Sequence, residues 1–139
     1  MITETSLCDD DASVAIAAAR AELVKRGKVG VIAVVDPRGE VIALLRMAGA
    51  AYSGVTVATN KAFTAARLRR PSMEVGRAVR HPELGYDAAY FGDARYVGFG
   101  GGLPVLKDGA VVGAVAVSGL SQADDEEIAR IAIAAILAR

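Results

Sequence analysis

The chain has 139 residues, which is enough for one domain with its own hydrophobic core. Sixteen basic residues balance sixteen acidic ones, so no net positive field favours nucleic acid or an anionic membrane surface as a partner. No apolar run is long enough to cross a bilayer and the first residues do not resemble a signal peptide, so we expect a cytoplasmic protein.

The chain begins with a polar stretch. We expect residues 1–9 to form a flexible leader and residues 10–139 to form a single domain. A single cysteine, Cys8, excludes an intramolecular disulfide and a metal site built from cysteines. Apolar residues at helical spacing then follow Asp9 and its acidic neighbours, and they predict a helix that ends near Gly27.

Two apolar segments separated by a turn come next. The runs Val29–Val35 and Glu40–Met47 predict strands, and the residues between them, DPRG, have turn chemistry. Because the first run is apolar on both faces, we expect this hairpin at the centre of a sheet. Ser53 then predicts the cap of a helix that runs to about Arg69, and Pro71 ends it.

A short helix over Ser72–Val79 leads into RHPELGYDAAYFGD, a stretch without periodicity that we interpret as the functional loop. Three short strands are then expected over Tyr96–Phe99, Leu103–Leu106 and Ala110–Val117, with a hairpin turn at Lys107, Asp108 and Gly109. The element order lacks β-α-β alternation. It predicts an α+β fold around one antiparallel sheet.

The last helix opens with an acidic first turn, for which Ser121 and Asp124 form the cap. Its remainder, IARIAIAAILA, is apolar on nearly every face. One small domain covers only part of such a helix, so we expect a homo-oligomer.

The segment GGGLPVLKDGAVVGAVAVSG is rich in glycine but lacks the pattern of a phosphate-binding loop. Its glycines precede a strand and Pro104 instead of a helix N-terminus, and no Gly-Lys-Ser/Thr follows. Gly109 suits the hairpin turn, while Gly113 and Gly119 permit close backbone approach. Gly100–Gly102 have no such explanation and suggest a close-fitting ligand or subunit.

Four segments occur in a recognisable order: GVIAVVDPRGEVIALLRMAGA, NKAFTAA, the glycine-rich segment and an acidic DDEEIA helix. From about residue 10 onward the chain resembles the GlcG/HbpS family, the heme-degrading or PduO C-terminal-like domain. The resemblance implies a profilin-like domain with a five-stranded antiparallel sheet flanked by helices. It also implies a homo-oligomer, from dimer up to octamer, that binds heme or a corrinoid-related partner.

Some members of that family ligate iron through a histidine of the first helix, but ASVAIAAARAEL contains none. Heme would then need His81, a tyrosinate from Tyr52, Tyr86 or Tyr90, or a subunit interface. The sequence itself favours a small anionic ligand over any named one.

Two basic residues are candidates for binding such a ligand, together with the amides of Gly100–Gly102. Arg46 alternates onto one strand face with apolar residues, so we expect it to be partly buried, either paired with Glu83 or Glu74 or clamping a ligand carboxylate. Lys61, in NKAFTAA, borders the apolar stripe of its helix and either extends to solvent or faces the ligand.

His81 is the only histidine, and with Glu83 and Tyr86 it forms the candidate catalytic set for proton transfer. The alternative is an incidental loop histidine, and we assign no metal site. Three functions remain open: binding of heme or a related tetrapyrrole, with or without degradation; an isomerase or lyase acting on a carboxylate-bearing substrate; and a non-catalytic oligomeric accessory protein.

Overall fold

The computed structural model describes all 139 residues. In chain order its elements are α1 (Asp9–Lys25), β1 (Val31–Val35), β2 (Val41–Arg46), α2 (Ser53–Leu68), α3 (Ser72–Val79), the short 3-10 helix η1 (Ala88–Phe91), β3 (Gly102–Lys107), β4 (Ala110–Ser118) and α4 (Gln122–Leu137). The predicted α+β class is confirmed. No helix is long and apolar enough to cross a membrane.

The sheet has four antiparallel strands in the order β2-β1-β4-β3. The expected fifth strand is absent, because Tyr96–Phe99 takes no strand conformation. We expected the first hairpin at the centre of the sheet, and this is right only for its first strand. β1 is central and buried throughout, whereas β2 forms an edge of the sheet.

Two buried hydroxyls explain why the segment before β3 is not a strand. Thr64 of α2 donates to the carbonyl of Arg95 and accepts from the amide of Val97, at 3.2 and 2.9 Å. Ser72 of α3 donates to the carbonyl of Phe99 at 2.6 Å and accepts from the amide of Gly102 at 3.0 Å. Side chains of two helices therefore satisfy backbone groups that a neighbouring strand would otherwise satisfy.

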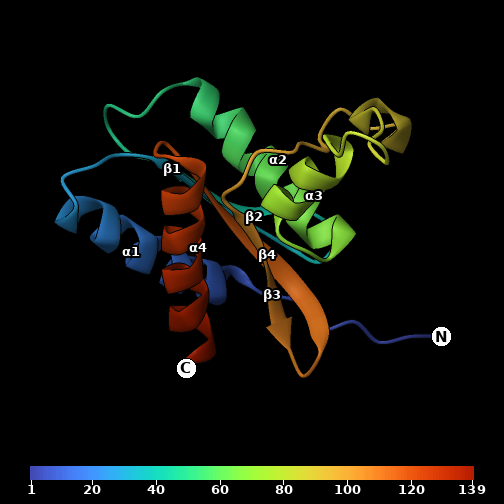
Figure 1. The fold of residues 1–139 in the computed structure, drawn as a ribbon. Helices are drawn as coiled ribbons and strands as arrows, with labels where there is room; N and C mark the ends of the chain where they lie inside the picture. The colour runs from blue at the N-terminus through green and yellow to red at the C-terminus, as the bar shows by residue number, and fades with distance from the viewer.

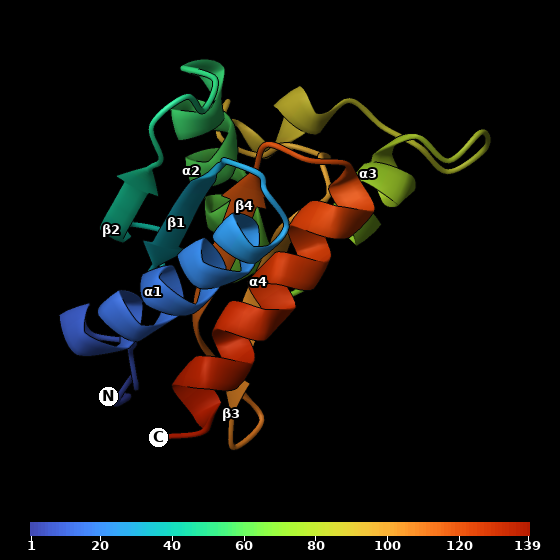
Figure 2. The same ribbon diagram turned by 90° about the vertical axis from the view of Figure 1, so that its left-hand side faces the viewer.

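Helices cover both faces of the sheet (Figures 1 and 2). α1 and α4 lie side by side on one face, and α2 packs on the other. The α1 and α4 face buries larger side chains such as Ile32 and Val115, whereas the α2 face buries Ala114 and Ala116 against alanines of the helix. Small side chains on both partners let α2 approach the sheet closely.

The predicted turns and helix ends are largely confirmed. Gly27 follows α1 with a φ of +65°, Asp108 and Gly109 turn the β3–β4 hairpin with positive φ, and Ser121 accepts from the amide of Asp124. Ser53 is the first residue of α2 and not its cap.

The N-terminal segment joins the domain before α1 starts. Leu7 is buried in the core, and its amide donates to the carbonyl of Val112 at 2.8 Å. Gly113 makes room for this contact, because a Cβ there would lie 2.6 Å from the Leu7 side chain. Residues 1–6 are exposed, and the flexibility of residues 1–9 stays a prediction.

Candidate functional site

A buried ion pair lies at the end of the sheet where β4 passes into α4. Nζ of Lys61 is 3.1 Å from Oδ2 of Asp125 and also donates to the carbonyl of Val117 at 3.0 Å. Oδ1 of Asp125 accepts from the amide of Leu120 at 2.9 Å. Burial raises the pKa of the Asp125 carboxyl above its ordinary value, and the Lys61 ammonium offsets that rise only in part.

The three consecutive glycines pack around this pair. Gly101 has a φ of +124°, and a Cβ there would lie 2.9 Å from Nζ of Lys61 and 2.7 Å from the carbonyl oxygen of Val117. A Cβ on Gly102 would meet the Lys61 backbone, and one on Gly100 would meet Met73. The fold itself therefore requires glycine at positions 101 and 102, where a Cβ would meet backbone atoms, which the sequence did not reveal.

A shallow hollow opens above the ion pair. Its walls come from α2, the segment before β3 and the β4–α4 connection, and its lining is Val57, Lys61, Phe99, Ser118, Gly119, Leu120, Ser121, Gln122 and Asp125. Lys61 faces this hollow only as half of a pair with Asp125. The expected positive hollow is thus neutralised at its base, and a ligand-binding role for Lys61 and Gly100–Gly102 stays a prediction.

Arg46 is exposed, so its predicted burial is wrong. Its guanidinium stacks 4.7 Å from the ring centroid of Tyr52, and it forms no ion pair with Glu74 or Glu83. The cause is its position as the last residue of an edge strand. A bulge in β2, opposite Val34 and Val35, also breaks the expected alternation with Ile42. A role for Arg46 in binding a ligand stays a prediction.

The imidazole of His81 forms hydrogen bonds within its own loop. Its Nδ1 accepts from the backbone amides of Glu83 and Leu84, at 3.2 and 3.0 Å. Because Nδ1 uses its lone pair in this way, the neutral imidazole carries its hydrogen on Nε2. Nε2 then has no lone pair for a metal until these two hydrogen bonds are released.

A row of aromatic rings connects the loop to α2. Ring centroids are 5.9 Å apart for Tyr86 and Phe91, 4.8 Å for Phe91 and Tyr96, and 5.0 Å for Tyr96 and the buried Phe63. The row holds Tyr86 beside the folded domain. Hydrogen bonds from the amide of Gly85 to the carbonyl of His81 and from the amide of Tyr86 to the carbonyl of Val79 close the loop that carries the candidate catalytic residues His81, Glu83 and Tyr86. These three residues line none of the three main hollows.

Sequence reasoning missed Asp125, the partner of Lys61. It grouped Asp125 with the acidic first turn of the last helix. The signal was available, because Asp125 stands at helical spacing from Ile128, Ala129 and Ala132, all of which are buried. The hydroxyls of Thr64 and Ser72 gave no comparable signal, since their partners are distant in sequence.

Comparison with known proteins gives consistent results. Residues 7–134 match the family described as "Haem degrading protein HbpS-like". Protein GlcG of Escherichia coli is 36% identical over 118 residues, which cover 85% of each chain.

Two solved structures are also similar. Protein ORFY of Klebsiella pneumoniae superimposes with a TM-score of 0.93 at 29% identity, over 100% of this chain and 96% of that one. A structure described as a PduOC:heme complex gives a TM-score of 0.85 at 29% identity, over 94% of this chain and 95% of that one.

Proposed function

The chain belongs to the HbpS-like family, and from this membership we propose that it binds heme or a closely related tetrapyrrole. The observation that carries the proposal is the likeness over nearly the whole chain to a protein whose structure is described as a heme complex. Heme would supply an iron centre and a large flat apolar surface. The residues of this chain must supply an axial donor, apolar contacts and cations for the propionates.

The exposed surface between the end of α3 and β3 carries suitable groups. Leu84 and Tyr90 are 76% and 82% exposed, and Phe91 and Phe99 are 38% and 54% exposed. Exposed apolar side chains of this size support a binding surface for a flat ligand or a partner. His81 and Tyr86 belong to the same segment and carry the atoms that could ligate iron.

Within one protomer, however, no donor of this kind lines any of the three main hollows. We therefore propose that heme binds against the loop surface and that a second copy of the chain closes the site. This arrangement also explains why the chain needs no histidine in α1. The homo-oligomer and the cytoplasmic location stay predictions.

A hemin titration tests the proposal. The wild type should shift and sharpen the Soret band and reach saturation at a fixed ratio of hemin to protein. His81→Ala, Tyr86→Phe and Tyr90→Phe each remove one donor, and the variant that removes the axial ligand should change the band. Tyr96→Phe is the matched control, because it keeps the ring that packs on Phe63.

A hemin spectrum unchanged by the wild type at tens of micromolar would overturn the proposal. Degradation of heme would appear in the same samples as loss of the Soret band after a reductant is added in air. The alternative of an isomerase or lyase places Arg46 and Lys61 in one site with His81. None of the three main hollows contains all of these residues, and the likeness to a protein whose structure is described as a heme complex leads us to favour binding.

A further inference from the structure

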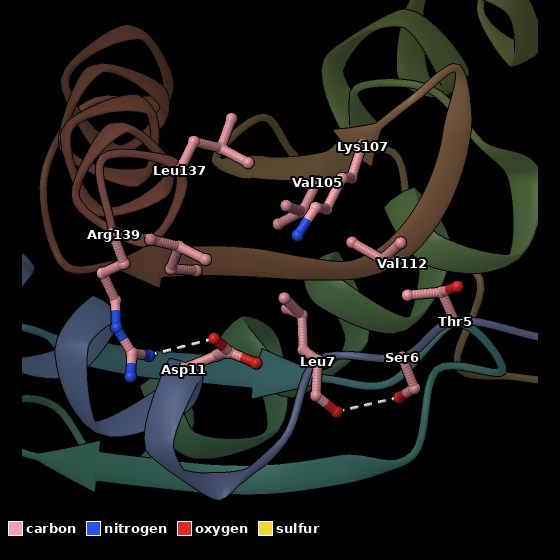
Figure 3. A pocket seen from close by; sticks show the side chains of 10 residues that line it. Thr5, Ser6, Leu7, Asp11, Val105, Lys107, Val112, Leu137 and Arg139 are labelled. Carbon is pink, nitrogen blue, oxygen red and sulfur yellow. Dashed lines mark hydrogen bonds and ion pairs between the residues drawn. The ribbon is translucent and has the colours of Figure 1, made fainter.

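We propose that a second site, independent of the heme surface, binds a small aliphatic carboxylate. β3 begins at Gly102 beside Lys61 and ends at Lys107, where a hollow of about 330 Å³ opens. The N-terminal segment, the β3–β4 hairpin and the end of α4 form its walls (Figure 3). A hollow of this volume is at the lower end of the range for small-molecule sites.

The floor of this hollow is aliphatic. Five side chains from four separate parts of the chain line it: Leu7, Val105, Val112, Ile136 and Leu137. All but Leu137 are buried. Leu7 is fixed by its backbone hydrogen bond to Val112, so the floor exists before any ligand arrives. Such a surface can bind an alkyl chain, but it offers no hydrogen bonds to a polar chain.

The charges around the hollow are not balanced. Asp11 pairs with Arg139 at 3.0 Å, and its other oxygen accepts from the amide of Cys8 at 2.8 Å. The side chain of Lys107 takes part in no hydrogen bond or ion pair, and only its backbone pairs, with Ala110 in the β3–β4 ladder. Its ammonium points into the hollow in Figure 3.

This combination defines the ligand. A free ammonium above an aliphatic floor matches a carboxylate joined to a short alkyl chain, because the carboxylate forms a charge-assisted hydrogen bond with Lys107 while the chain covers the exposed part of Leu137. The hydroxyl of Thr5 also lines the hollow and offers a donor to the second carboxylate oxygen, whereas the Ser6 hydroxyl donates to the carbonyl of Leu7 at 2.8 Å. A cationic ligand would meet the Lys107 ammonium and is disfavoured.

Titration of the full chain with hexanoate, hexan-1-ol and hexylamine, followed by methyl chemical shifts in NMR spectra, tests the site. Hexanoate should saturate shifts of Leu7, Val112 and Leu137 methyls, and the alcohol and the amine should bind more weakly. Loss of one charge-assisted hydrogen bond predicts that Lys107→Met binds hexanoate about tenfold more weakly. Lys107→Arg should bind it nearly as well as the wild type.

Lys28→Met, which removes another exposed lysine, is the matched control and should bind hexanoate like the wild type. Equal binding of hexanoate and hexan-1-ol, equal affinity of Lys107→Met and the wild type, or an absence of shifts at these methyls would each overturn the proposal. His81→Ala should leave hexanoate binding unchanged, so failure of the heme proposal and failure of this one are distinguishable.

Discussion

Lys61 and Asp125 form an ion pair across the end of the sheet, with 4% and 2% of their side chains exposed. Lys61 belongs to α2 and Asp125 to α4, and these helices cover opposite faces of the sheet (Figure 1). The pair therefore connects the two helical layers directly. It also holds the glycine segment between them, since Gly101 lies against both residues.

Removal of the Lys61 ammonium should destabilise the fold at neutral pH. Lys61→Met leaves the Asp125 carboxylate buried without a counter-ion, which costs about 3 kcal/mol in the free energy of unfolding. The double variant Lys61→Met/Asp125→Asn should recover part of that loss. Urea unfolding measures both, and a double variant less stable than Lys61→Met would show that the charge is not the cause.

The stability of the wild type relative to Asp125→Asn should depend on pH. The pKa of Asp125 is raised in the folded state from an ordinary value of 3.8, chiefly by burial, so the folded chain holds this proton more tightly than the unfolded chain. The resulting stabilisation is complete below pH 3.8 and is lost as pH rises through the raised pKa. Denaturant unfolding of both proteins from pH 3 upward measures the difference, and a difference that grows with pH would contradict the assignment.

Gly101→Ala should destabilise the chain far more than Gly109→Ala. Both glycines have positive φ, but only the Gly101 Cβ would meet neighbouring atoms, while nothing lies within 4 Å of the Gly109 Cβ. Backbone strain alone predicts a loss of about 1 kcal/mol for Gly109→Ala, and Gly101→Ala should exceed it several-fold. Similar urea midpoints for the two variants would mean that the residues around Gly101 can move to accommodate a Cβ at little cost in stability.

The neutral imidazole of His81 should carry its hydrogen on Nε2. Two backbone amides donate to Nδ1, and they can do so only if Nδ1 is unprotonated. Two-bond ¹H–¹⁵N correlation spectra of the imidazole at a pH where it is neutral report the tautomer. A dominant Nδ1–H form would contradict the loop geometry and would leave Nε2 free to ligate iron without rearrangement.

The chain should be oligomeric in solution. The helix α4 exposes Ala134, and the loop surface exposes Tyr90 and Phe99. Sedimentation velocity at micromolar concentration measures the mass. A strict monomer, with and without hemin, would contradict both the oligomer and the shared heme site.

Local sequence signals predicted most of the fold. The four α-helices, the four strands and the hairpin turn at Gly109 follow from periodicity and turn chemistry, which act over a few residues, whereas the short helix η1 lies in the stretch that we interpreted as a loop. The extra strand at Tyr96–Phe99 was wrong because distant hydroxyls, those of Thr64 and Ser72, take its backbone groups. Sequence gives no sign of such distant partners.

The candidate site was less predictable for the same reason. Lys61 lies on the border of two helix faces, and only the fold determines that Asp125, 64 residues later, neutralises it. Arg46 lies on the same face of β2 as Leu44, as the alternation predicts, but alternation does not show whether a strand is central or at an edge of the sheet. The edge position exposes its guanidinium.

Both outer strands of the sheet carry features that interrupt hydrogen bonding to a further strand. β2 contains a bulge beside Ile42, and β3 contains Pro104, which has no backbone N–H to donate. Edges of this kind resist strand addition from a neighbouring molecule. Copies of this chain would therefore assemble through side chains of helices and loops. A continuous β-sheet between molecules, and the aggregation that such a sheet causes, would be disfavoured.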